Sequence, residues 1–419
     1  MEQSNRTTSF FSKPISPAKK NASLFLLLFS VLLTLLLPLI SIPLNIFGLV
    51  FTSGKIRKTY GLLLAFSLAM IAYIWIPRST MDLYRHHQQV YSLSGFNFDE
   101  LGKLIADNLE PLQYLTKFVV AQIGNYGLLQ FFVIFCGYFE LFWLTCDIAE
   151  VKRIKKLGFS LLLLFAFSAV KFIDFASGLW FNLALINLFV GIYMFYFRGN
   201  KFKAYLFYII AACLHVGVLY IVLPVIVLSH LKIFQKYRLV TMFSIFLVYL
   251  LFGTILSLLS DTFGSGFKLL DMTSHMYNSY YTNGSQFDSL HTGWNMYLPI
   301  INIAISLIMA IFCLKDDGLK KYSCFVMYIL MCILASIINA GVFVRYGFFA
   351  AMLAMPLLAD FIKNNKNRQL GSFVVVIITI LIMTELSRSF SQLQSVGLLS
   401  RIADNIGKST FIIMKGSNE

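Results

Sequence analysis

The sequence predicts an all-α fold, that of a polytopic integral membrane protein with about 11–13 transmembrane or half-membrane helices and two long extracytoplasmic loops. Hydrophobic residues occupy 58% of the 419 positions and charged residues only 13%, whereas soluble domains carry about 25% charged residues. Mean hydropathy is +0.76, and apolar runs of about 20 residues, enough to cross about 30 Å of hydrocarbon, recur along the chain. A soluble multidomain enzyme, a coiled coil and a disordered chain are excluded, and residues 1–419 are treated as a single polytopic domain.

The first apolar run, 22–52, is about 30 residues long, which is long for one tilted helix and short for two full spans. Basic residues flank it on both sides, and Pro38 and Pro43 bracket a place for a turn. The sequence therefore allows either a hairpin or a single long helix. No small-x-small cleavage site follows Leu24–Leu36 where a signal peptide would need it, so this run is expected to be retained.

Further runs are of the length of single spans. One longer run, 204–231, has basic loops on both flanks, and such loops favour the cytoplasm. It should therefore enter and leave by the same side, as a helical hairpin with its turn near residues 213–217. A C-terminal tail, 389–419, follows the last span. The single spans are predicted at 60–76, 127–146, 157–173, 175–197, 239–259, 296–314, 322–341, 343–362 and 370–387.

Charge gives these spans a direction. Lys and Arg number 34 against 19 Asp and Glu, a net charge of +15, which in a soluble domain would suggest nucleic acid. The enrichment of cytoplasmic loops in Lys and Arg explains the excess more simply, so no nucleic-acid partner is expected. With the basic loops inside, two long polar loops, 77–125 and 260–295, lie outside. The basic loops contain Lys152–Lys156, Arg198–Lys203, Lys232–Arg238, Lys315–Lys321 and Lys363–Arg368.

The first outer loop is rich in residues that could carry chemistry. An arginine at headgroup depth can grip a phosphate through two parallel hydrogen bonds, although an interfacial arginine that snorkels to lipid headgroups is the simpler interpretation of each one. Apolar positions between 99 and 123 have near-helical spacing, and Pro111 interrupts them, which predicts two short surface helices. Glu110 is then a functional carboxylate or a helix-start acid.

Two ionisable residues stand in apolar surroundings. His215 lies at the tip of the predicted hairpin, and Arg345 lies near the outer end of its span. An ionisable group within a membrane is costly and usually marks a site, although a lone His can also be a satisfied core residue. Arg345 requires an anionic partner, from the protein or from a ligand. Lys171 and Asp174 are expected to neutralise each other.

Several patterns are absent from the sequence. It contains no Gly-x-x-x-x-Gly-Lys-Ser/Thr phosphate loop and no Gly-x-Ser-x-Gly elbow. It also has no His-x-x-x-His zinc pattern, and the neighbouring His86 and His87 are a weak signal because consecutive side chains point apart on a helix. The six cysteines lie in or beside apolar runs without Cys-x-x-Cys spacing, as small buried residues do. No metal and no other cofactor is expected.

Short motifs occur in a characteristic order along about 270 residues. Each is weak alone, but their order and spacing resemble the EpsG/Wzy-type polysaccharide polymerases of bacteria. One stretch departs from that family: Gly178–Ala184 lacks the arginine that commonly precedes a Leu-Ala step, so either Lys171 supplies the charge or that role does not carry over. The motifs are Arg78 with Asp82-Leu83-Tyr84, Glu110-Pro111-Leu112-Gln113-Tyr114, Ala211-Ala212-Cys213-Leu214-His215, and Arg345-Tyr346.

The resemblance implies a polymerase that joins lipid-linked oligosaccharide repeat units on the outer face of the cytoplasmic membrane. The growing chain would move onto a sugar hydroxyl of the next unit and leave undecaprenyl pyrophosphate. Developing charge on the pyrophosphate requires cations, and the hydroxyl requires a base. The candidate bases are His215, Asp82 and Glu110, and the candidate pyrophosphate- and sugar-binding residues are Arg345, Arg78, Arg85, Tyr84 and Tyr114.

Other functions remain open at this point. A flippase or other transporter of the lipid-linked unit would need charges in many spans, whereas here the ionisable residues gather at the outer edge. An O-antigen ligase or an acyltransferase is a related alternative. The resemblance implies lipid-linked oligosaccharide and membrane lipids as partners, with a chain-length regulator and a flippase acting alongside. The sugar, its linkage and the class of polysaccharide are not predicted.

Overall fold

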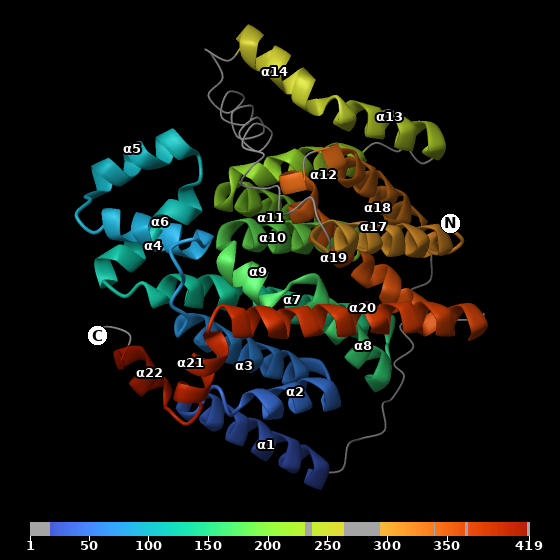
Figure 1. Cartoon of the computed structure of the whole chain (residues 1–419). Coiled ribbons are helices and arrows are strands. Elements are labelled where there is room, and N and C mark those ends of the chain that lie inside the picture. The colour runs from blue at the N-terminus through green and yellow to red at the C-terminus, as the bar shows by residue number, and fades with distance from the viewer. Residues whose placement is uncertain (1–16, 231–236, 264–293, 339, 365–367, 417–419) are drawn as a thin grey trace.

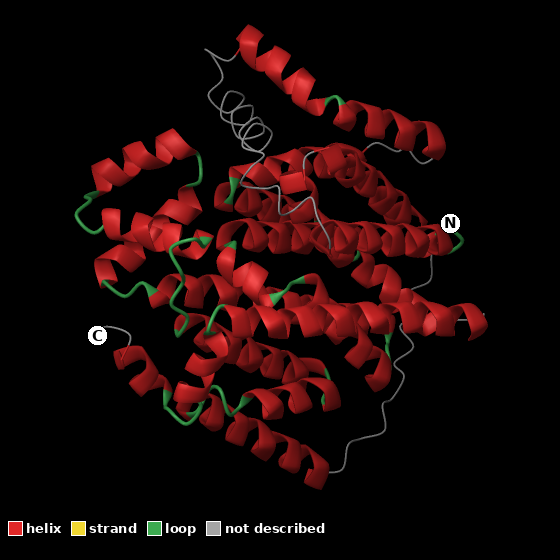
Figure 2. Cartoon of the chain, viewed as in Figure 1, coloured by secondary structure: helices red, strands yellow, loops and turns green. Residues whose placement is uncertain are grey.

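The computed structural model describes residues 17–230, 237–263, 294–338, 340–364 and 368–416, and these form helices joined by loops, with no strand among them (Figure 2). Five of the described helices are long and apolar enough to cross a membrane, and six shorter apolar helices accompany them. The predicted all-α polytopic membrane fold is therefore confirmed. The five are α7 (Gly127–Lys152), α10 (Leu179–Tyr196), α18 (Asp317–Ala335), α19 (Ala340–Asn364) and α20 (Arg368–Ser395).

The N-terminal apolar run forms two helices, α1 (Pro17–Leu36) and α2 (Ile42–Phe51), which lie beside α3 (Gly54–Tyr73) (Figure 1). The turn between α1 and α2 is held by buried polar groups. Ser41 Oγ donates to the Pro38 carbonyl at 2.8 Å, and Asn45 Nδ2 donates to Thr34 Oγ1 at 3.0 Å. The first bond satisfies a carbonyl that the helix break leaves in an apolar setting, and the second links α2 to α1.

The first outer loop is helical in three places: α4 (Asp82–Ser92), α5 (Phe98–Asn108) and α6 (Pro111–Ile123). The sequence predicted two surface helices after residue 99 and did not predict α4. Helix α5 begins with a capping box between Asn97 and Glu100, which satisfies two free backbone N–H groups. Proline occupies the first turn of α6, where its missing N–H costs nothing.

The centre of the bundle is α10, whose residues are nearly all buried. Before it come α8 (Lys156–Ala169) and the short α9 (Phe172–Ser177). After it, the run 204–231 is divided between α11 (Lys201–Leu214) and α12 (Leu219–His230), with His215 and the 3₁₀ turn η1 (Val216–Val218) between them. The backbone at His215 is extended, with φ −157° and ψ 115°, which ends α11.

The second half adds α13 (Arg238–Leu250), α14 (Phe252–Phe263), α17 (Trp294–Cys313) and the 3₁₀ turn η5 (Ser336–Ile338). The last span continues as α20 to Ser395, and the C-terminal tail then forms α21 (Leu398–Asn405) and α22 (Thr410–Gly416). Most of the second outer loop lies outside the described residues.

One group of ion pairs lies at the end of the bundle that carries the basic loops. Lys152 Nζ lies 2.7 Å from the Asp360 carboxylate, which joins α7 to α19. The Asp147 carboxylate accepts from Lys58 Nζ at 3.0 Å and from Arg198 Nε at 2.9 Å. Helices α10 and α19 end here and begin at the opposite end of the bundle; at 1.5 Å per residue their 18 and 25 residues span about 27 Å and about 37 Å.

Candidate functional site

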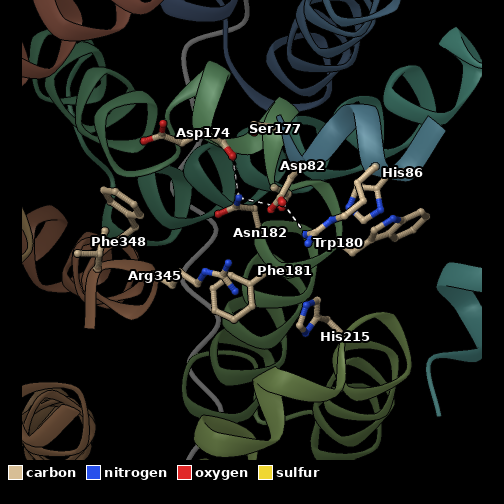
Figure 3. A pocket seen from close by; sticks show the side chains of 13 residues that line it. Asp82, His86, Asp174, Ser177, Trp180, Phe181, Asn182, His215, Arg345 and Phe348 are labelled. Carbon is tan, nitrogen blue, oxygen red and sulfur yellow. Dashed lines mark hydrogen bonds and ion pairs between the residues drawn. The ribbon is translucent and has the colours of Figure 1, made fainter. Parts of the chain in front are cut away.

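A cavity of about 340 Å³ opens where α10 and α19 begin, at the end of the bundle opposite the Lys152–Asp360 pair. Its walls come from α4, α9, α10, the His215 turn and α19 (Figure 3). These elements are far apart in the sequence, so only the folded bundle brings their side chains together. The charged and imidazole groups that line it are Asp82, Arg85, His86, Asp174, His215 and Arg345.

Helix α4 brings three of these groups on neighbouring turns. Arg85 Nη2 lies 2.5 Å from the Asp82 carboxylate, and the two side chains are three residues apart on one helical face. Burial, together with the smaller effect of the positive charge of Lys117, lowers the pKa of His86 to about 3. His86 is therefore neutral at physiological pH, and its Nδ1 lies 3.3 Å from Gln89 Oε1.

The junction of α9 and α10 supplies a carboxylate and an amide. Asn182 Nδ2 donates to the backbone carbonyls of Asp174 at 3.1 Å and Gly178 at 3.0 Å. Both amide hydrogens are thus used on the backbone, and Asn182 Oδ1 remains an acceptor for the cavity. The Asp174 carboxylate lies 3.7 Å from Lys171 Nζ. Lys171 has a nearer partner than the predicted Asp174, since its Nζ lies 2.9 Å from Glu385 of α20.

The turn between α11 and α12 presents His215 to the cavity. Its Nδ1 accepts a hydrogen bond from the Gly217 N–H at 3.0 Å, and its ring meets Phe181 edge to face at 5.4 Å between centroids. A Cβ on residue 217 would lie 3.0 Å from ring atoms of His215. Glycine at this position therefore lets the imidazole approach the turn closely.

Arg345 extends from the second turn of α19, and its guanidinium carbon lies 5.7 Å from the centroid of Phe181. An aromatic face at this distance favours a cation. The next residue, Tyr346, donates its hydroxyl to the Gly217 carbonyl at 2.6 Å. The helix that carries Arg345 is thus tied to the turn that carries His215.

Glu110 lies behind His215 and does not line the cavity. One carboxylate oxygen accepts from the Val216 N–H at 3.0 Å, and the same oxygen is 3.7 Å from His215 Nδ1. Gln113 Nε2 donates to the other oxygen. Burial raises the pKa of Glu110, while the Val216 N–H and the charge of Lys117 oppose that rise.

The remaining predicted residues lie outside the cavity walls. Arg78 donates to the Ser395 carbonyl at 2.7 Å, at the end of α20. Tyr84 is exposed on α4, and the ring of Tyr114 is 5.0 Å from Lys117 Nζ. The cavity therefore unites Asp82, Arg85, His215 and Arg345 but not Arg78, Tyr84, Tyr114 or Glu110. The second predicted outer loop also carries polar and aromatic residues that lie outside the described residues: Asp271, His275, Tyr277, Tyr280, Tyr281, Asp288 and His291.

Sequence reasoning missed Lys117, whose side chain is almost completely buried, with 1% of the residue exposed. Its Nζ donates to Gln89 Oε1 at 2.6 Å and to Gln113 Oε1 at 2.8 Å. Burial lowers its pKa to about 7, although the negative charge of Glu110 opposes the fall. The spacing of Glu110, Gln113 and Lys117, by three and four residues, was a signal available in the sequence, because it places them on one side of a helix.

The described residues include no group of three or more His, Cys, Asp or Glu side chains that could hold a metal ion. What the cavity offers is two arginines, two carboxylates, an amide oxygen and the aromatic side chains of Trp180, Phe181 and Phe348. Arginines bind anionic oxygens, carboxylates accept protons or hydroxyl hydrogen bonds, and aromatic faces support flat ligands. Such a set suits a ligand that carries both hydroxyls and an anionic group.

The model of the EpsG family matches residues 58–395. The chain belongs to the EpsG family. This is the family of Wzy-type polysaccharide polymerases, and the match includes every element that lines the cavity. Membership supports a polymerase role in polysaccharide biosynthesis for this EpsG-family protein. No curated protein and no solved structure matches the chain significantly.

Proposed function

We propose that this protein polymerises undecaprenyl-pyrophosphate-linked oligosaccharide repeat units on the outer face of the bacterial cytoplasmic membrane. The observation that carries the proposal is the cavity in which Arg345, Arg85, Asp82 and His215 meet. Family membership supplies the class of reaction, and the cavity contains groups suited to each part of it. The basic loops lie at the end of the bundle opposite the cavity. Because such loops favour the cytoplasm, their position supports a cavity that faces outward.

Arg345 and Arg85 bind the pyrophosphate of the donor in this proposal. A departing pyrophosphate gains negative charge on the oxygen that was bonded to the sugar, and preorganised cations stabilise that charge. Arg85 is paired with Asp82, and a pyrophosphate that enters the cavity competes for the same guanidinium. Transfer of Arg85 from Asp82 to the phosphate would free the Asp82 carboxylate when substrate is present.

Asp82 then acts as the base in this proposal. Both oxygens of Glu110 already accept hydrogen bonds, and Glu110 lies off the cavity. Asp82 lines the cavity and is partly exposed. The acceptor hydroxyl oxygen attacks the anomeric carbon of the donor sugar, and its proton passes to Asp82. The bond from that carbon to the pyrophosphate oxygen breaks, and undecaprenyl pyrophosphate leaves with the electron pair.

The size and lining of the cavity fit the reacting ends of two substrates. A volume of about 340 Å³ is at the lower end of small-molecule sites, so most of each glycan would extend into solvent. Trp180, which is only 2% exposed, forms the aromatic part of the cavity wall together with Phe181 and Phe348. A flippase that delivers units and a regulator of chain length are the proposed partners.

Deletion of the gene and complementation with variants test this function in the source organism. Without the protein, cells should carry single repeat units in place of a ladder of chain lengths on a polysaccharide gel. Arg345→Ala should fail to restore the ladder, and Arg345→Lys should restore part of it because the charge remains. Arg401→Ala is the matched control, since Arg401 is exposed on α21 and outside the cavity walls.

Protein level in each strain is measured by immunoblot, so that loss of the ladder is not confused with loss of the protein. An unchanged ladder after deletion would disprove the proposed function. A fully active Arg345→Ala at normal protein level would disprove the pyrophosphate role of Arg345 while leaving the polymerase assignment standing.

A further inference from the structure

Four polar groups form a chain from a buried helix face to the turn at His215. Lys117 donates to Gln113, Gln113 donates to Glu110, and Glu110 accepts from the Val216 N–H. We propose that Glu110, Gln113 and Lys117 are positioning residues that hold this turn and fix His215 as a hydrogen-bond donor to the substrate through its Nε2–H. The catalytic consequence rests on the proposed function, whereas the state of His215 does not.

The direction of every bond in the chain is determined by its two ends. The amino group of Lys117 donates to two amide oxygens, Gln89 Oε1 and Gln113 Oε1. An ionised carboxylate only accepts. Gln113 therefore must turn its oxygen to Lys117 and its nitrogen to Glu110. The donors and acceptors of this series of hydrogen bonds therefore have a single order, and Glu110 at its end can only accept a hydrogen bond from a backbone N–H of the turn.

The turn is held from two sides. Glu110 binds the Val216 N–H from the outer loop, and Tyr346 donates to the Gly217 carbonyl from α19. Between these two contacts, the Gly217 N–H points to His215 Nδ1 at 3.0 Å. Phe181 packs against the ring. The imidazole of His215 is therefore held by the backbone of its own turn at Nδ1 and by the ring of Phe181.

These contacts specify where the proton of His215 lies. A nitrogen that accepts an N–H hydrogen bond carries no proton, so the neutral ring holds its proton on Nε2. The Glu110 oxygen that lies 3.7 Å from Nδ1 is itself occupied by the Val216 N–H. His215 is thus prepared to donate to a ligand oxygen and not to take a proton from the acceptor hydroxyl. This differs from the base role considered for it from the sequence.

Nitrogen NMR of the purified full-length protein, labelled with ¹⁵N-histidine, tests the proton position without substrate. The His215 signals are assigned by their disappearance in His215→Asn. We expect an unprotonated Nδ1 and a protonated Nε2 in the unmodified protein. A protonated Nδ1 would overturn the proposal, whatever the activity of the protein.

Two variants then test whether the polar chain and the turn maintain this state. Glu110→Gln places an amide where the series of hydrogen bonds requires a group that only accepts. Gly217→Ala pushes the His215 imidazole away from the turn. Each variant should therefore give mixed protonation of the two His215 nitrogens. Asp99→Asn, which removes a carboxylate from the exposed surface of α5, should leave the signals unchanged. If both Glu110→Gln and Gly217→Ala keep the signals of the unmodified protein, the positioning role is wrong.

Activity of the same proteins separates positioning from direct catalysis. We expect Glu110→Gln to lower the rate of chain extension by about 10²-fold, the scale of a misplaced catalytic group, while any fall of the rate on the acid side of the pH profile stays as in the unmodified protein, because Glu110 lies off the cavity. Loss of that acid limb in Glu110→Gln would make Glu110 the base and refute the proposal.

A double variant tests whether Lys117 and Glu110 act through one chain. The double variant Glu110→Gln with Lys117→Met should lose about as much activity as the more damaging single variant. The second change adds little because the first has already broken the series of hydrogen bonds. If the fold-loss of activity in the double variant equals the product of the two single losses, the residues act independently and the proposal is wrong. Lys103→Met, at an exposed position of α5, is the matched control for Lys117→Met.

Discussion

Lys117→Met should change how the stability of the protein depends on pH. Lys117 is buried with 1% exposed, and burial lowers its pKa from 10.5 to about 7. Methionine has a similar length and no charge, so it fills the same space. It also removes hydrogen bonds to Gln89 and Gln113, a loss that is the same at every pH. The pH-dependent part of the change therefore isolates the titration of Lys117.

The sign follows from the two states of the lysine. Between pH 7 and 10.5 the unfolded chain keeps the Lys117 proton and the folded chain releases it, so the free energy of unfolding rises with pH across this window. The cost of the buried charge is complete below pH 7 and absent above pH 10.5. A shift from 10.5 to about 7 corresponds to at most about 5 kcal/mol at 1.36 kcal/mol for each pKa unit.

Thermal unfolding of the detergent-solubilised protein, followed by tryptophan fluorescence, measures this difference. Trp180 lies 5.9 Å from Lys117 Nζ and reports on the region. For a chain of this length about 1 kcal/mol moves Tm by about 1 °C. From pH 7 to 10 the Tm of Lys117→Met should therefore fall by a few degrees relative to that of the unmodified protein. Lys103→Met should follow the unmodified protein. If the Tm of Lys117→Met instead runs parallel to that of the unmodified protein from pH 7 to 10, the buried lysine carries no such pH-dependent cost.

Three further substitutions have distinct expected outcomes. Asp147→Ala should lower the free energy of unfolding by about 1–3 kcal/mol in thermal unfolding, because it removes the partner of Arg198, which is 42% exposed and can regain water. Gly347→Ala should cost about 1–3 kcal/mol in the same assay, because its Cβ would lie 2.3 Å from Pro299 of α17. Trp180→Phe should raise KM for lipid-linked units severalfold at normal protein level, because the smaller ring leaves part of the cavity wall unfilled.

The helical character of the apolar runs was predictable because a membrane interior requires every backbone polar group to be satisfied within a helix. The bounds were less so: the predicted single span 239–259 is divided between α13 and α14. Helix α4 was not predicted because its residues are polar, and only Leu83 and Val90 are buried on it. An acid at its first position, Asp82, was the one local sign of a helix start. Short polar helices on a membrane surface leave little trace in hydropathy.

The candidate site was predictable where an ionisable residue stood alone in apolar sequence. His215 and Arg345 meet that description, and the cavity includes both. The ion-pair partner of Lys171 could not be predicted from neighbouring residues, because its nearest carboxylate belongs to Glu385, more than 200 residues away. Asp174 was therefore assigned to Lys171 alone, although it also lines the cavity. Pairing between distant helices depends on packing, which a single sequence does not display.

The most direct test of the proposed polymerase function uses the purified protein in lipid vesicles, given undecaprenyl-pyrophosphate-linked repeat units and no other enzyme. The products are separated by size and by whether they remain lipid-linked. A polymerase should give longer lipid-linked glycans, with one undecaprenyl pyrophosphate released for each unit added, and Arg345→Ala should give neither product. Units that cross the vesicle membrane without lengthening, or units that remain unchanged with a folded protein, would contradict the proposed function.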